Sequence, residues 1–213
     1  MIQLWHCADA RSFRALWALE ELGVPYELKL LPFPPRVRAP EYLEINPLGT
    51  IPFFVDGETR MTESSAILQY LAVRHGGPLN VPNDDGDYGA WLNWLHFGEA
   101  TLTFPQTLVL RYRRFEPGKA EVVADDYAKW FLARLRAVDR ALETGDWLCA
   151  ERFTAADISV GYALLLAAQL GLDAEFTPAI AAYWARVQAR PAFQAAKASQ
   201  VRHAPAGAEA FPT

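Results

Sequence analysis

A stretch rich in glycine, proline, asparagine and aspartate, residues 76–89, divides the chain into two parts with different periodicity. Such clusters are typical of loops and linkers. Before it, short β-prone runs alternate with helical runs, and after it apolar residues recur at the spacing of amphipathic helices. The change of period predicts an α/β domain over residues 1–78, a linker over 79–87 and an all-helical domain over 88–213.

The order of elements in the first part predicts a small mixed sheet covered by helices. A strand–helix–strand unit favours a parallel pair of strands, and the Asp56-Gly57 dipeptide is a strong hairpin signal that adds antiparallel strands. Four prolines within residues 32–40 predict a loop there. The predicted strands are residues 2–6, 26–31, 52–55 and 59–61, and the predicted helices are residues 12–22 and 64–75.

The second part carries one clear helix start. Thr154 followed three residues later by Asp157 has the pattern of a capping box, and it opens an apolar run over residues 158–170 that predicts a buried helix. Two shorter helices are predicted over residues 179–189 and 192–199, and we expect the tail after His203 to pack poorly.

Composition excludes several classes of protein. Of the 213 residues, 52% are hydrophobic and 21% charged, values of a globular chain. Neither an apolar run of about 18 residues nor a strongly basic stretch occurs, so we expect a cytosolic protein that binds neither membrane nor nucleic acid. Two cysteines and four scattered histidines predict no disulfide framework and no metal site.

The Ile51-Pro52 dipeptide is the first of three local signals for a ligand site. If this bond is cis, the turn leaves the main-chain N–H and C=O of Ile51 unpaired, and an extended ligand can add there like a short strand. The alternative is an ordinary turn before a strand.

The second signal is Glu63-Ser64 at the start of the helix over residues 64–75. A helix start offers free N–H groups and partial positive charge, so Ser64 can bind a carboxylate while Glu63 binds an adjacent ammonium group. Together they would recognise the zwitterionic end of an amino acid. The alternative is that Ser64 caps the helix and Glu63 complements its dipole.

The third signal is the turn over residues 7–12, which enters a helix start where a hydroxyl, thiol or amide can stabilise an anion. Cys7 lies too early for a redox cysteine at a helix start and has no CxxC partner, so it is interpreted as a buried cysteine. Ser12 is either an anion-binding hydroxyl or an N-cap.

These signals in this order, followed by an all-helical half, resemble the glutathione S-transferase family, with the class open among cytosolic, bacterial-type members. The resemblance covers roughly residues 2–200. It rests on the ordered set of residues 17–27 (WALEELGVPYE), 46–52 (NPLGTIP), 63–67 (ESSAI) and 154–158 (TAADI). It implies a thioredoxin-like domain followed by a helical domain, and a homodimer that binds glutathione as co-substrate.

The resemblance also assigns roles to residues of this chain. Ile51 and Pro52 would meet the cysteinyl backbone of glutathione, Glu63 and Ser64 its γ-glutamyl end, and Arg38 or Arg36 its glycine carboxylate. The segment 154–157 would be structural.

At the usual sulfur-contacting position this chain departs from the family. A Ser or Cys is common where Asp9 stands, and a carboxylate beside a thiolate is repulsive. Ser12 is therefore the predicted catalytic residue, with Asp9 and Arg11 as alternatives.

The resemblance implies a glutathione transferase that activates the thiolate for attack on an apolar electrophile, as in detoxification. The candidate residues of the electrophile pocket are Phe97, Thr101, Phe104, Pro105 and Tyr112. Two alternatives stay open. One is glutathione-dependent disulfide reduction, and the other is a non-catalytic binding protein with this fold, suggested by Asp9.

Overall fold

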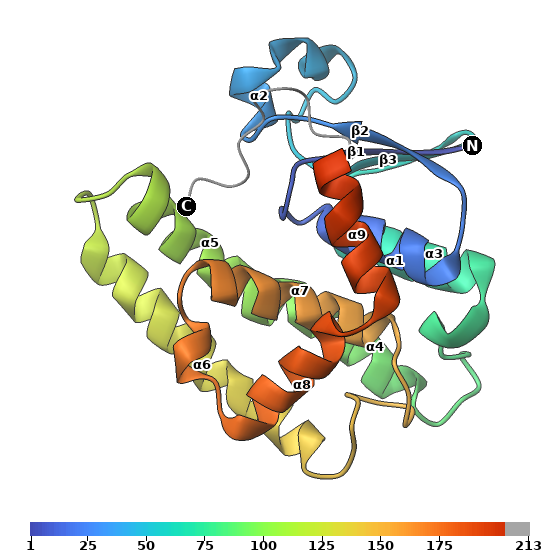
Figure 1. Cartoon of the computed structure of the whole chain (residues 1–213), viewed down its shortest axis with the longest axis vertical. Coiled ribbons are helices and arrows are strands. Elements are labelled where there is room, and N and C mark those ends of the chain that lie inside the picture. The colour runs from blue at the N-terminus through green and yellow to red at the C-terminus, as the bar shows by residue number, and fades with distance from the viewer. Residues whose placement is uncertain (203–213) are drawn as a thin grey trace. The chain divides into compact units, whose positions relative to one another are not determined.

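The computed structural model describes residues 1–202, which form two compact units (Figure 1). The first unit is Met1–Gly77 together with the described residues from Ala189 onward, and the second is Pro78–Gln188. The last helix thus belongs to the first unit although it follows the second in sequence. The predicted domain boundaries stay a prediction, and the tail after His203 lies outside the described residues.

A four-stranded mixed sheet with strand order β2-β1-β3-β4 is the centre of the first unit. β1 pairs in parallel with β2, while β1–β3 and β3–β4 are antiparallel. The pairing follows from the connections, since a helix links β1 to β2 and a tight turn at Gly57 links β3 to β4. The strands are β1 (Ile2–His6), β2 (Tyr26–Leu30), β3 (Phe53–Asp56) and β4 (Thr59–Met61).

Helices cover one face of this sheet. α1 packs against both α3 and α9 (Figure 1). Phe54 of β3 packs edge-on against Tyr70 of α3. Alternate strand residues point the other way, where Trp5 and Val55 pack against a small cluster around the buried Tyr42. The helices of this unit are α1 (Phe13–Leu22), α2 (Pro35–Arg38), α3 (Ser64–His75) and α9 (Pro191–Arg202).

The prediction of a loop over residues 32–40 is wrong in part. This segment contains the short helix α2, and a 3₁₀ turn, Pro40–Glu44, follows it. Pro35 takes the first helical position, where the missing N–H is not needed and the fixed φ suits a helix.

The second unit is helical, and α7 (Ala155–Gln169) is its buried centre. α4, the π-helical turn Gly98–Thr103 and α8 all pack against α7. The predicted capping box is confirmed: the Thr154 N–H donates to Asp157 Oδ2 at 2.8 Å, and the Ala156 N–H donates to Thr154 Oγ1 at 3.2 Å. The other helices are α4 (Tyr88–Phe97), α5 (Phe104–Leu110), α6 (Glu121–Leu142) and α8 (Pro178–Gln188). Within residues 1–202, no helix is both long enough and apolar enough to cross a bilayer.

Candidate functional site

The register of the sheet brings the three predicted signals to one end of the first unit. Trp5 lies opposite Phe53, and Phe54 lies opposite Met61. Because both pairings are antiparallel, the end of β1, the start of β3 and the end of β4 meet there. The turn after β1, the Ile51–Pro52 dipeptide and the start of α3 are therefore neighbours.

The main chain of Ile51 forms an open edge at this end. The Ile51–Pro52 bond is cis, as predicted. Neither the N–H nor the C=O of Ile51 makes a hydrogen bond with any other residue in the described range, 1–202. The preceding carbonyl, that of Thr50, is instead occupied, since Tyr42 Oη and Asn46 Nδ2 donate to it at 2.7 and 2.8 Å. These bonds hold the turn from behind and leave Ile51 available to a ligand.

The start of α3 lies next to this edge. The start of α3 has no side-chain capping hydrogen bond, so Ser64 does not cap the helix, while Glu63 stands where its charge complements the helix dipole. The Glu63 carboxylate is exposed, and Ser64 Oγ accepts a hydrogen bond from the fully buried Arg14, whose Nη1 lies 3.2 Å away. The Ser65 hydroxyl is buried and has no hydrogen-bond partner within residues 1–202. The first turn of α3 thus combines an exposed carboxylate, two hydroxyls and free main-chain N–H groups.

Cys7 is buried, as expected, and its thiol is directed at a main-chain carbonyl. Its Sγ donates to the carbonyl of Pro32 at 3.6 Å. Burial raises the pKa of the Cys7 thiol to about 12, so the thiol is protonated at neutral pH. This side chain therefore supplies no nucleophile.

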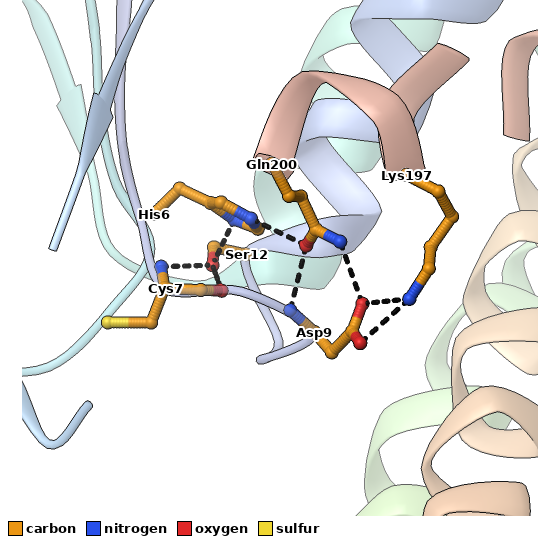
Figure 2. A network of polar contacts seen from close by, with 6 residues as sticks. All are labelled: His6, Cys7, Asp9, Ser12, Lys197 and Gln200. Atoms are coloured by element: carbon orange, nitrogen blue, oxygen red, sulfur yellow. Dashed lines mark hydrogen bonds and ion pairs between the residues drawn. The ribbon is translucent and has the colours of Figure 1, made fainter. Parts of the chain in front are cut away.

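The structure gives the Ser12 hydroxyl a partner inside the protein. Ser12 is fully buried, and its Oγ lies 2.7 Å from His6 Nδ1 and 3.4 Å from the N–H of Cys7 (Figure 2). It stands at the start of α1 but makes no side-chain capping bond. The catalytic role of Ser12 stays a prediction, and the hydrogen bond to His6 counts against it.

The carboxylate of Asp9 is turned toward α9, as Figure 2 shows. Asp9 has a positive φ of 54°, and Lys197 Nζ contacts its two carboxylate oxygens at 2.6 and 2.7 Å. Gln200 Nε2 donates to the same carboxylate at 2.8 Å. The negative charge that would repel a thiolate therefore has a counter-charge beside it. Arg11, the remaining catalytic candidate, is partly buried in the same turn.

The arginines predicted to bind the glycine carboxylate lie in α2. Arg36 and Arg38 are both exposed, and no main-chain hydrogen bond joins either to Ile51 or Ser64. Their predicted role stays a prediction.

The candidates for an electrophile pocket lie in the second unit. Phe97 and Thr101 line a shallow hollow of about 370 Å³ on α4 and the π-helical turn that follows it. Phe104 is 57% exposed and, like Tyr112, lies outside this hollow; Pro105 is buried. The hollow is also lined by Leu92, Asn93, His96 and Ala100.

Sequence reasoning did not identify Lys197 and Gln200 of α9 as part of this site, and it gave no role to His6. No local pattern signals them, because they are 188 to 194 residues from the turn that they contact. The sequence indicates only that a last helix exists in this region, and it does not indicate that the helix contacts the turn after β1. No cluster of potential metal ligands occurs within residues 1–202.

Comparison with known proteins supports this description. Residues 7–79 match the family model of the glutathione S-transferase N-terminal domain, and residues 106–191 match that of the C-terminal domain. Glutathione S-transferase 3 of Schizosaccharomyces pombe is 33% identical over 74% of this chain and 70% of its own length. Glutathione S-transferase GstA of Escherichia coli O157:H7 is 31% identical over 75% of this chain and 78% of its own length.

Solved structures show the same fold. The crystal structure of a glutathione transferase from Methylococcus capsulatus has a TM-score of 0.83 and 28% identity, and the alignment covers 95% of this chain and 100% of that one. A sphingomonad glutathione S-transferase complexed with glutathione has a TM-score of 0.82 and 26% identity, covering 93% of this chain and 98% of that one. The ordered motifs, both domain matches and the shared fold agree: this chain belongs to the glutathione S-transferase family.

Proposed function

We propose that the chain binds glutathione at the end of the sheet where Ile51 and the start of α3 meet. The open main chain of Ile51 is the observation that carries this proposal. It offers one donor and one acceptor to an extended peptide, in the manner of an added strand. The first turn of α3 then holds the γ-glutamyl end, with Ser64 and the N–H groups at the carboxylate and Glu63 at the ammonium group. The orphan hydroxyl of Ser65 is a further donor there.

The bound thiol is proposed to react as a thiolate with an apolar electrophile. A free thiol has a pKa of about 8.5, and lowering it to about 7 takes roughly 2 kcal/mol of differential stabilisation. The start of α1 contributes partial positive charge, and Arg11 of the same turn contributes a full one. Phe97 and Thr101 are proposed to contact the electrophile.

Calorimetric titration with glutathione tests the binding site. We expect Ser64→Ala and Glu63→Gln each to weaken binding about tenfold, the usual effect of losing one charge-assisted hydrogen bond. Glu58→Gln is the control, because Glu58 is an exposed carboxylate on the β3–β4 hairpin and is not proposed to contact glutathione. Absence of heat at millimolar glutathione, or equal affinity in all three variants, would refute the proposed site.

Two assays separate the reactions. Turnover of a chloronitrobenzene supports conjugation, whereas faster turnover of a mixed disulfide supports glutathione-dependent reduction, in which glutathione supplies the sulfur because Cys7 is buried. Binding without turnover in either assay would identify a non-catalytic member of the family.

We further propose that the chain is a homodimer acting in the cytosol, where glutathione is abundant. Leu48 is 65% exposed and Ile45 45% exposed, so the first unit presents apolar side chains that a second copy can cover. Sedimentation velocity tests this assembly, and a single species of 23.8 kDa at micromolar concentration would contradict it.

A further inference from the structure

The side-chain amide of Gln200 has its orientation fixed by a single residue. Its Oε1 accepts from the main-chain N–H of Asp9 at 2.7 Å, and its Nε2 donates to the Asp9 carboxylate at 2.8 Å (Figure 2). A main-chain N–H can only donate and a carboxylate can only accept. Rotating the amide by 180° would place donor against donor and acceptor against acceptor, so Asp9 determines which atom of Gln200 is the oxygen.

This oxygen in turn determines which nitrogen of His6 carries the proton. His6 Nε2 lies 2.8 Å from Gln200 Oε1, which is an acceptor, so Nε2 must carry hydrogen. Burial lowers the pKa of His6 to about 4, so the ring is neutral at pH 7 and its Nδ1 is bare. The charged groups that act on the His6 ring are Asp9 and Lys197, which pair with each other.

The bare Nδ1 then fixes the hydroxyl of Ser12. A bare ring nitrogen accepts a hydrogen bond, and His6 Nδ1 lies 2.7 Å from Ser12 Oγ. The Cys7 carbonyl is the other acceptor in reach, but it lies 3.5 Å away, so Ser12 donates its only hydrogen to His6. The oxygen also accepts from the N–H of Cys7 at 3.4 Å. A serine hydroxyl has one donor, and here it points into the protein.

We propose that Gln200 is a positioning residue that sets the β1–α1 turn, fixes His6 in the Nε2–H tautomer and directs the hydroxyl of Ser12 inward, away from the sulfur of a bound glutathione. Four residues are connected in order by hydrogen bonds: Asp9 through its main chain and carboxylate, Gln200 through its amide, His6 through its ring and Ser12 through its hydroxyl. α9 is thereby part of the candidate site although it lies at the far end of the sequence. The statement about the glutathione sulfur rests on the proposed function, whereas the assignment of the His6 tautomer is independent of it.

The first test is nitrogen NMR of protein labelled at its four histidines, without ligand, with His6 assigned by comparison with His6→Asn. We expect His6 to be neutral from pH 5 to 9, with hydrogen on Nε2 and Nδ1 bare. Gln200→Leu removes the acceptor that faces His6 Nε2 and should give a mixture of tautomers. Hydrogen on Nδ1 in the unaltered protein would overturn the inference, and this measurement requires no variant to fold beyond the one used for assignment.

The second test measures ionisation of bound glutathione by ultraviolet absorbance of the thiolate between pH 6 and 10. We expect Ser12→Ala to change the thiol pKa by less than 0.3, because Ser12 does not face the sulfur. A rise of one unit or more in the pKa of the bound thiol, which means about tenfold less thiolate at neutral pH, would overturn the inference. If glutathione does not bind at all, the proposed function fails. The inference about Gln200 is then tested by the NMR measurement of the His6 tautomer alone.

Discussion

The contact between α7 and the π-helical turn Gly98–Thr103, which follows α4, allows a sharp prediction at Gly98. A Cβ atom added there would lie 2.4 Å from Ser159 Oγ, 2.6 Å from its carbonyl carbon and 2.7 Å from its carbonyl oxygen. Two of these are main-chain atoms of α7, which cannot rotate away as a flexible side chain can. We therefore expect Gly98→Ala to force the two helices apart.

Three effects determine how much Gly98→Ala changes the free energy of unfolding. Overpacking of this kind costs about 3 kcal/mol when the main chain must shift. Ser159 Oγ donates to the carbonyl of Leu95 at 2.6 Å, and losing that hydrogen bond costs about 1 kcal/mol. Alanine is the better helix former by up to about 1 kcal/mol. The net expectation is a loss of about 3 kcal/mol in the free energy of unfolding of the second unit.

Urea denaturation followed by tryptophan fluorescence measures this loss, with Gly89→Ala as the matched control. Gly89 lies in α4, directly before that turn, and an added Cβ there meets nothing within 4 Å. Only the helix propensity remains, so Gly89→Ala should stabilise the protein by about 0.5 kcal/mol. The reasoning would be refuted if the two variants had equal midpoints, or if Gly98→Ala lost less than about 1 kcal/mol.

Three further perturbations have defined expectations. His6 takes up a proton below pH 6.5 in the unfolded chain but only near pH 4 in the folded chain, so the free energy of unfolding should fall by about 3 kcal/mol as the pH is lowered from 6.5 to 4. Urea denaturation at several pH values measures this fall, which should be smaller in His6→Asn. The same pH dependence in both proteins would contradict the expectation. Tyr183→Phe removes a 2.9 Å hydrogen bond to the buried Asp157 carboxylate and should lower the free energy of unfolding by about 2 kcal/mol in the same assay. A decrease of less than 0.5 kcal/mol would contradict this expectation. Lys197→Met removes one positive charge from beside the Asp9 carboxylate, which is 14% exposed, and we expect about fivefold weaker glutathione binding by calorimetry. Lys129→Met, at an exposed lysine of α6, is the control, and unchanged affinity in both variants would show that this charge does not act on the ligand.

Much of the fold was predictable because it is coded by neighbours in sequence. The hairpin after β3 and the capping box at Thr154 each depend on residues within a few positions of one another. The same holds for the open edge at Ile51 and the start of α3, which lie within a short stretch of chain. The helix α2 was missed because prolines were interpreted only as helix breakers, although Pro35 is well placed at a first position.

The sequence by itself determined the order of the elements, the family and the cis bond before Pro52, since these follow from local patterns along the chain. Only the tertiary structure decided what the polar groups of the β1–α1 turn do. Ser12 is equally a donor to sulfur and to histidine when judged from its neighbours in sequence. Its hydroxyl has one hydrogen, and the distant Gln200, through His6, determines where that hydrogen points.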